Sequence, residues 1–173
     1  MKRILVPTDF TVQSLQLVHE IVKRNPQQQL SIHLVHLVQI PADITELLFV
    51  KKSRLHDQVP YKFSQAVEML KNKYASCIAW MGIEFYYGST ATALNNIIEN
   101  RKIQEVFVFA GHAYGKPLKG SVDAISLLNR CRVPVCSIQP KVGTGGPGEA
   151  QLFSSLFVEE QPVQKTGKLL QKA

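Results

Sequence analysis

The sequence predicts an α/β fold, in which a doubly wound parallel sheet is covered by helices on both faces. Three observations indicate it: short apolar runs alternate with stretches of helical periodicity, turn residues separate them, and the alternation continues to about residue 140. Alternation of this kind implies crossover connections, which make neighbouring strands parallel and place helices on both sides of the sheet. Ligands in such folds usually bind at loops beyond the carboxyl ends of the strands.

The first half of the chain is expected to supply two strands and two helices. Residues 4–6 form a short strand that ends at a proline, and Thr11 is the expected N-cap of the first helix. Residues 30–38 are apolar in part on both faces, which indicates a central strand. Residues 40–60 read as an irregular excursion with one turn of helix. The next helix is amphipathic, with these apolar residues on one face: Phe63, Val67, Leu70, Tyr74 and Ile78.

The second half is expected to supply three strands and two helices. Residues 83–87 form a strand, and residues 88–90 open the next helix. Residues 105–110 form a strand that runs into a glycine loop, and Gly120–Ser121 is expected to cap the last helix. Residues 133–138 form the last strand, and the proline inside it favours an edge position or the start of a strand.

Composition limits the organisation and the class of protein. The chain has 173 residues, of which 45% are hydrophobic and 19% charged, so it can bury one substantial core. The segment 143–148 reads GTGGPG and is typical of a linker. It predicts a domain at residues 1–140 and a tail at residues 141–173.

Charge and cysteine content restrict the partners and the compartment. The net charge of +7 favours anionic partners in general, without indicating specific nucleic-acid binding. Three cysteines, never spaced C-x-x-C, argue against a disulfide framework or a zinc site and favour the cytoplasm. No apolar run reaches the roughly 20 residues of a membrane span, and the N-terminus does not resemble a signal peptide.

The segment Gly111–Ser121, GHAYGKPLKGS, is the most informative for function. It joins a buried strand to a predicted helix, and its three glycines allow backbone N–H groups to approach an anion. Lys116 and Lys119 add positive charge, and Ser121 adds a hydroxyl. These features suit a phosphate. A turn with an ordinary serine cap is the alternative interpretation.

Asp9 and His112 are the side chains expected near this loop. Asp9 follows the first strand, where it either accepts hydrogen bonds from a base or sugar or simply stabilises a turn. His112 either contacts a ligand or is an ordinary loop residue. His33 and His36 are three apart on a strand, so they point to opposite faces and cannot share a metal ion. We interpret them as an ordinary strand pair, with one of the two hydrogen-bonded inside the fold.

Several catalytic and nucleotide motifs are excluded. The loop does not match the Gly-x4-Gly-Lys-Ser/Thr pattern of a Walker A motif, and no GxGxxG follows the first strand. No GxSxG is present, and only one acidic residue follows the first strand, which argues against a receiver domain. With no nucleophile–base pair or metal cluster in view, we expect no catalytic residues, no metal site and no enzymatic role.

The chain resembles the universal stress protein family over residues 1–140. The resemblance rests on the opening KRILVPTDFT, the strand that ends near Val38, Gly88 before a helix and the closing GSVDAISLLNRCRVPVCSI. It implies a five-stranded parallel sheet in the order 3-2-1-4-5, Rossmann-like and related to the adenine nucleotide alpha hydrolases. It also implies homodimers formed through the last strand, here Val133–Ile138. Covering that edge would also remove an exposed template for aggregation.

Members of the family that bind ATP share a Gly-x2-Gly-x9-Gly-Ser/Thr loop, an Asp after the first strand and backbone contacts at the end of the second. The nucleotide-binding residues that the resemblance and the loop indicate are Pro7, Thr8, Asp9, Val38, Gly111, His112, Gly115, Lys116, Gly120, Ser121 and Val122. Three residues separate the first two of these glycines and four precede the third, so the loop is shorter than the family pattern. Part of the enclosure around a triphosphate would then be lost.

The leading hypothesis is therefore a universal-stress-type regulatory homodimer that binds ATP with Mg, or another adenine nucleotide, weakly. Slow incidental hydrolysis is compatible with it. The alternative is a module that binds no nucleotide and acts through its dimer edge and tail. The tail carries the apolar residues Leu152, Phe153, Leu156, Phe157 and Val158. They either dock on the domain, or on a partner protein or subunit, or belong to a solvated extension.

Overall fold

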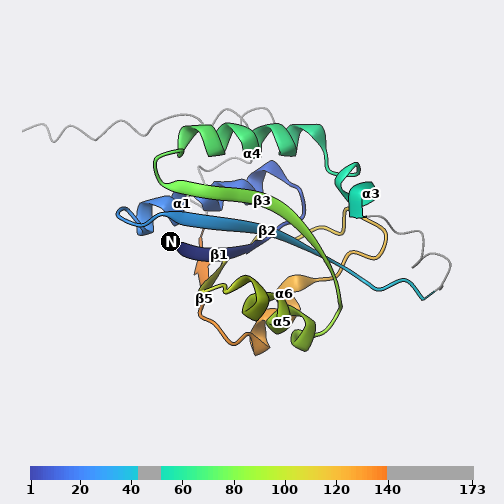
Figure 1. Ribbon diagram of the computed structural model, residues 1–173. Coiled ribbons are helices and arrows are strands. Elements are labelled where there is room, and N and C mark those ends of the chain that lie inside the picture. Colours follow the sequence, from blue (N-terminus) through green and yellow to red (C-terminus); the bar gives the residue numbers. More distant parts are fainter. Residues whose placement is uncertain (43–51, 140–173) are drawn as a thin grey trace, which may run out of the picture.

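A computed structural model describes residues 1–42 and 52–139 of the protein (Figure 1). Its five strands form one parallel sheet in the order β3-β2-β1-β4-β5. This confirms both the α/β class and the strand order expected from the sequence. The strands are β1 Lys2–Pro7, β2 Leu30–Val38, β3 Ile78–Tyr87, β4 Glu105–Phe109 and β5 Val135–Ile138.

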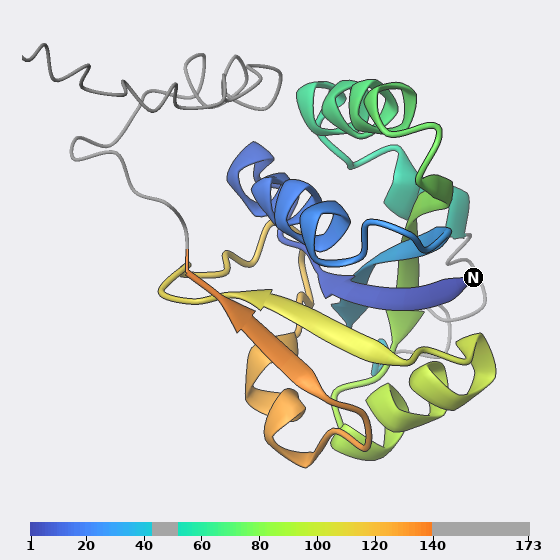
Figure 2. The same ribbon diagram turned by 90° about the vertical axis from the view of Figure 1, so that its left-hand side faces the viewer.

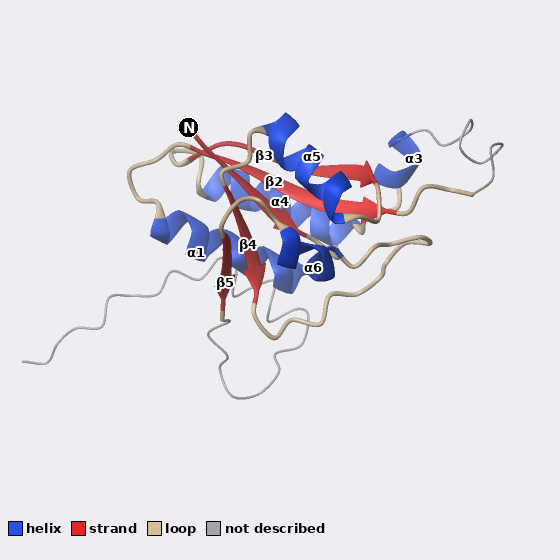
Figure 3. Ribbon diagram, turned by 90° about the horizontal axis from the view of Figure 1, so that it is seen from below, coloured by secondary structure: helices blue, strands red, loops and turns tan. Residues whose placement is uncertain are grey.

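Helices cover both faces of the sheet (Figures 1 and 3). On one face lie α1 Gln16–Arg24, which follows the 3-10 turn η1 Val12–Leu15, and α4 Tyr61–Lys73. On the other face lie α5 Ala91–Arg101 and α6 Ala124–Leu127, the latter followed by η2 Leu128–Arg130. The short helix α3 Lys52–His56 precedes α4. Within the described ranges, no helix is long and apolar enough to cross a membrane.

The core consists of two apolar layers separated by the sheet. Every residue of β2 is buried, because this strand is flanked by β1 and β3 and covered on both faces. Ile32 and Leu34 pack in the layer under α1 and α4, whereas Val35 and Leu37 pack in the layer under α5. The prediction of a central strand at residues 30–38 is therefore confirmed.

The boundary between α4 and β3 differs from the sequence-based expectation. The helix was predicted to reach Ile78, but α4 ends at Lys73, and Tyr74 is its C-cap. A turn follows, in which the Cys77 and Ile78 N–H groups donate to the Tyr74 carbonyl, and β3 begins at Ile78 rather than Ile83. Ile78 packs in the same apolar layer as the apolar residues of α4, so in the sequence it continues the helical spacing although it belongs to the strand.

The segment after β4 holds a second correction. Ser121 does not cap a helix; the cap of α6 is Asp123, whose Oδ1 accepts from the Ile125 N–H at 3.0 Å. Ser121 instead forms an antiparallel bridge with Val38 at the end of β2. The Gly-rich segment thus packs as a loop against the sheet edge and does not lead directly into a helix.

Two further expectations can be compared directly. The Thr11 side chain caps the first helical turn by accepting from the Ser14 N–H. β5 is an edge strand, which is one of the two positions that its proline favoured. It starts at Val135 rather than residue 133, and Pro134 contributes only its carbonyl, to the Val106 N–H. Figure 2 shows β5 as the outermost strand on the β4 side. The predicted linker and tail lie outside the described residues.

Candidate functional site

A pocket of about 300 Å³ opens at the carboxyl ends of β1 and β2, between the loop after β1 and the loop after β4. This volume is at the lower end of the roughly 300–1,000 Å³ of small-molecule sites. Seven of the residues named from the sequence line it: Pro7, Thr8, Asp9, His112, Gly115, Lys116 and Val122. The apolar wall, which the sequence did not indicate, includes Val35, Leu37 and Ile125.

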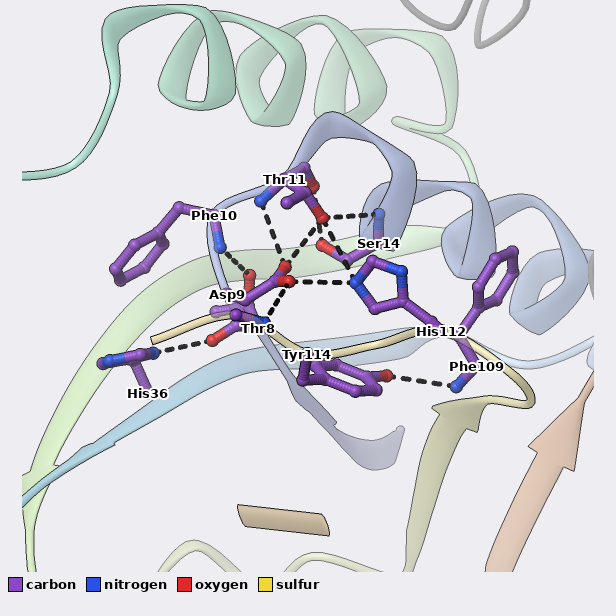
Figure 4. A network of polar contacts seen from close by, with 10 residues as sticks. Thr8, Asp9, Phe10, Thr11, Ser14, His36, Phe109, His112 and Tyr114 are labelled. Carbon is purple, nitrogen blue, oxygen red and sulfur yellow. Dashed lines mark hydrogen bonds and ion pairs between the residues drawn. The ribbon is translucent and has the colours of Figure 1, made fainter. Parts of the chain in front are cut away.

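Asp9 lies at the centre of the polar contacts in this pocket (Figure 4). Its Oδ1 accepts hydrogen bonds from the Thr11 N–H at 3.2 Å and the Thr11 hydroxyl at 2.7 Å. Its Oδ2 accepts from His112 Nε2 at 2.9 Å and from the Gly115 N–H at 3.0 Å. Each carboxylate oxygen therefore accepts two hydrogen bonds from the protein itself.

These contacts keep the carboxylate charged although Asp9 is only 5% exposed. Burial by itself would raise the pKa of Asp9, but the hydrogen bonds from Gly115, Thr11 and His112 outweigh it, so the pKa lies below its ordinary value. The sequence placed Asp9 near the glycine loop, and the structure brings them together. It also shows that the loop bonds to Asp9 directly.

A sharp backbone turn directs Asp9 toward the loop. Phe10 has φ of 61°, a left-handed conformation that costs about 1–2 kcal/mol for a residue with a side chain. The Phe10 N–H donates to the Thr8 hydroxyl at 3.1 Å, and the Phe10 ring packs 4.7 Å from His36 and 5.6 Å from Phe63. Packing of this buried ring offsets the backbone strain and fixes where Asp9 points.

His36 is a second buried polar group at the pocket, where the sequence had indicated only that one of His33 and His36 would be hydrogen-bonded inside the fold. Its Nδ1 lies 2.7 Å from the Thr8 carbonyl oxygen, which can only accept, so Nδ1 carries the proton. Nε2 then accepts from the Ser121 hydroxyl at 2.9 Å, and that oxygen accepts from the Leu118 N–H at 3.0 Å. Burial lowers the pKa of His36, which favours this neutral state.

Backbone bonds hold the second part of the loop against the end of β2. The Gln39 N–H donates to the Gly120 carbonyl at 2.7 Å, and the Val122 N–H donates to the Leu37 carbonyl at 2.9 Å. The Val38 carbonyl accepts from Gly88 at 2.9 Å. Four of the residues named from the sequence do not line the pocket: Val38, Gly111, Gly120 and Ser121.

The structure also reveals a nucleophile–base pair that sequence spacing did not suggest. Ser31 Oγ lies 3.1 Å from His33 Nε2, and His33 Nδ1 lies 2.7 Å from Glu84 on the neighbouring strand. Ser31 is only 4% exposed, so a substrate could not reach its hydroxyl. We assign this trio to packing. His33 and His36 contact different faces of the sheet, as expected, and the described part of the chain holds no metal-binding cluster.

Comparisons with known proteins identify the fold. No protein-family model matches the sequence, and no curated protein matches it. Universal stress protein UspA from Lactobacillus plantarum aligns with a TM-score of 0.52 and 17% identity, over 79% of this chain and 97% of that one. The hypothetical protein MJ0577 aligns with a TM-score of 0.52 and 14% identity, over 82% and 98% of the two chains.

A universal stress protein family protein from Arabidopsis thaliana, with AMP bound, aligns with a TM-score of 0.47 and 13% identity, over 82% of this chain and 93% of that one. The strand order, the pocket at the carboxyl edge and the two alignments above a TM-score of 0.5 define the class: the protein has the universal stress protein fold.

Proposed function

We propose that the protein is a universal-stress-type regulatory protein that acts as a homodimer and binds an adenine nucleotide weakly. One observation carries the proposal: Asp9, at the end of β1, meets the Gly111–Ser121 loop in a pocket at the carboxyl edge of the sheet. Pockets at this edge are the usual ligand sites of doubly wound folds. Membership of the universal stress protein family and the cytoplasmic location are parts of the same proposal.

The pocket's residues suit a nucleoside better than a chain of phosphates. The apolar wall at Val35, Leu37 and Ile125 offers a surface for a base, and Asp9 is an acceptor for an amino or hydroxyl group. Lys116 is exposed at the pocket and has the charge to attract a phosphate. If the nucleotide brings Mg, the ion would accompany its phosphates and needs no protein ligand here.

Affinity is expected to be low, because the protein already satisfies its own binding groups. The Asp9 carboxylate accepts four hydrogen bonds, so a ligand can only exchange for them, and each exchange changes the free energy by about 1 kcal/mol. The Gly115 N–H donates to Asp9 and is not available to a phosphate. The negative charge of Asp9 also disfavours a phosphate beside it.

Calorimetric titration of the purified protein with adenosine, AMP and Mg-ATP tests the nucleotide part. We expect millimolar binding of AMP that weakens about two- to fivefold in Lys116→Ala, the loss expected for an exposed charge contact. Adenosine binding should be unchanged in that variant. Lys62→Ala, an exposed lysine on α4, is the matched control. Absence of heat with all three ligands at millimolar concentration would refute nucleotide binding.

The dimer part concerns β5, the edge strand in which Val135 is 39% exposed. An antiparallel pair of β5 strands would cover this edge and join two sheets. We expect Val135→Lys to weaken self-association in sedimentation velocity, because it places like charges together at a two-fold interface. Ile40→Lys, at another exposed apolar residue, is the control. A dimer that is equally stable in both variants would contradict the assignment of β5.

The four hydrogen bonds that the Asp9 carboxylate already accepts from the protein also favour the second candidate, an interaction module without a nucleotide. In that case the bonds from His112 and Gly115 serve to fix the loop, and the protein acts through its dimer edge and a protein partner of the tail. A persistent dimer with no response to nucleotide would support it. In either case we propose no enzymatic role beyond slow incidental hydrolysis.

A further inference from the structure

A surface strip along β3 and α5, separate from the Asp9 pocket, has the features of an occupied surface. α5 crosses the second half of β3, and in Figure 3 no described helix covers the first half on this face. Trp80, the only tryptophan in the sequence, lies there and is 41% exposed. Its ring packs 4.6 Å from the His33 ring and so close above Gly82 that a Cβ there would lie 2.6 Å from it.

The strip continues past Trp80 into a groove of about 380 Å³ between β3 and α5, lined in part by Tyr86, Asn96, Asn100 and Arg101. Asn96 and Asn100 lie one helical turn apart on α5, and both are exposed. A carboxamide offers both a donor and an acceptor, and the i, i+4 spacing on a helix is close to that of every second peptide group in an extended segment, so the two can pair with such a segment.

The charged side chains of the strip are paired with one another, and one exposed lysine follows them in the chain. Glu84 Oε1 lies 2.6 Å from Arg101, and Glu84 Oε2 lies 2.7 Å from His33, so the middle of the strip carries no free negative charge. Lys102 follows directly and is exposed as the C-cap of α5. An occupant that matches this surface is uncharged and apolar over most of its length and acidic at one end.

One segment of the chain outside the described residues has this composition. Residues 150–158 read AQLFSSLFV, without a charged residue, and Glu159 and Glu160 follow. We propose that residues 150–160 dock on the Trp80–Lys102 strip of the same molecule. Ten residues separate them from Gln139, the last described residue, and the eleven Cα–Cα steps from Gln139 to residue 150 can span about 36–40 Å. The sheet from β5 to β3 is about 19 Å wide, at roughly 4.8 Å per strand.

Trp80 reports occupancy of the strip directly, because it is the sole tryptophan of the full chain. In Phe153→Asp/Phe157→Asp we expect a red shift of the emission maximum and stronger quenching by acrylamide, since the indole becomes exposed to water. Val163→Asp, an apolar tail residue outside the docking segment, is the control and should leave both unchanged. Far-UV circular dichroism checks that each variant is folded.

A charge reversal tests the contact of Glu159 and Glu160 with Lys102, independently of Phe153 and Phe157. Lys102→Glu should expose Trp80 partly, shifting the docked fraction by about two- to fivefold as expected for an exposed ion pair. Glu159→Lys/Glu160→Lys in the same chain should restore protection. Emission that is identical in all variants would overturn the proposal. Protection that appears only as protein concentration rises would also overturn it, because the occupant would then be a second copy.

Discussion

Replacing Asp9 by Ala should lower the free energy of unfolding by about 2–4 kcal/mol, because it leaves buried donors without an acceptor. The donors are the Thr11 N–H and hydroxyl, His112 Nε2 and the Gly115 N–H. A carboxylate that served only as an open ligand contact would have no such effect. Urea unfolding followed by circular dichroism measures the difference.

Asp9→Asn and Asp57→Ala sharpen this experiment. The amide retains one acceptor oxygen, so Asp9→Asn should fall between the wild type and Asp9→Ala. Asp57 is exposed, and its removal should change stability by no more than about 0.5 kcal/mol. The pKa of Asp9 is lowered from 3.8, so its contribution is present above that pH and is lost as pH falls through the folded-state pKa. Equal stability of Asp9→Ala and Asp57→Ala would disprove a structural role of Asp9.

Stability should also fall as the pH drops below about 6.5, and His36 should account for a defined part of this fall. Burial lowers the pKa of His36 from 6.5, so the unfolded chain takes up a proton that the folded protein resists. The stabilisation is complete above the unfolded-state pKa and is lost between that value and the folded-state pKa. Protonation would also place a proton on Nε2, where the Ser121 hydroxyl donates.

His36→Leu should remove this part of the pH dependence and cost about 1–3 kcal/mol at pH 7.5, because the Thr8 carbonyl and Ser121 hydroxyl lose a partner. Urea unfolding at a series of pH values between 5 and 8 gives both quantities. His56→Gln, at the exposed last residue of α3, is the control and should change the free energy of unfolding at pH 7.5 by no more than about 0.5 kcal/mol. A wild-type profile in His36→Leu would show that other groups cause the acid sensitivity.

The core strands were predictable because a buried strand needs apolar residues at positions that the sequence shows. A strand with apolar residues on both faces, as at residues 30–38, is expected to be covered on both faces, and every residue of β2 is buried. The end of α4 was not predictable in the same way. Ile78 contributes to the same apolar layer from a strand, so the periodicity of the helix continued past the residue at which the helix ends.

The sequence predicted which segments of the candidate site lie close together, but it did not predict the hydrogen bonds between their residues. Asp9 and the Gly111–Ser121 loop both follow the carboxyl ends of central strands, which places them side by side in any parallel sheet of this order. His36 was missed, although its position near the end of β2 was an available signal. Its role depends on the proton donor and acceptor that it meets, Thr8 and Ser121, which come from different segments.

The sequence by itself determined the α/β class, the central strand and the segments that meet at the carboxyl edge, because these follow from local periodicity and from residue types. Only the tertiary structure decided that the Asp9 carboxylate is bonded by His112 and Gly115, and that Ser121 caps no helix. A hydrogen bond between residues about a hundred positions apart depends on ångström-scale geometry, and no local pattern in the sequence specifies it.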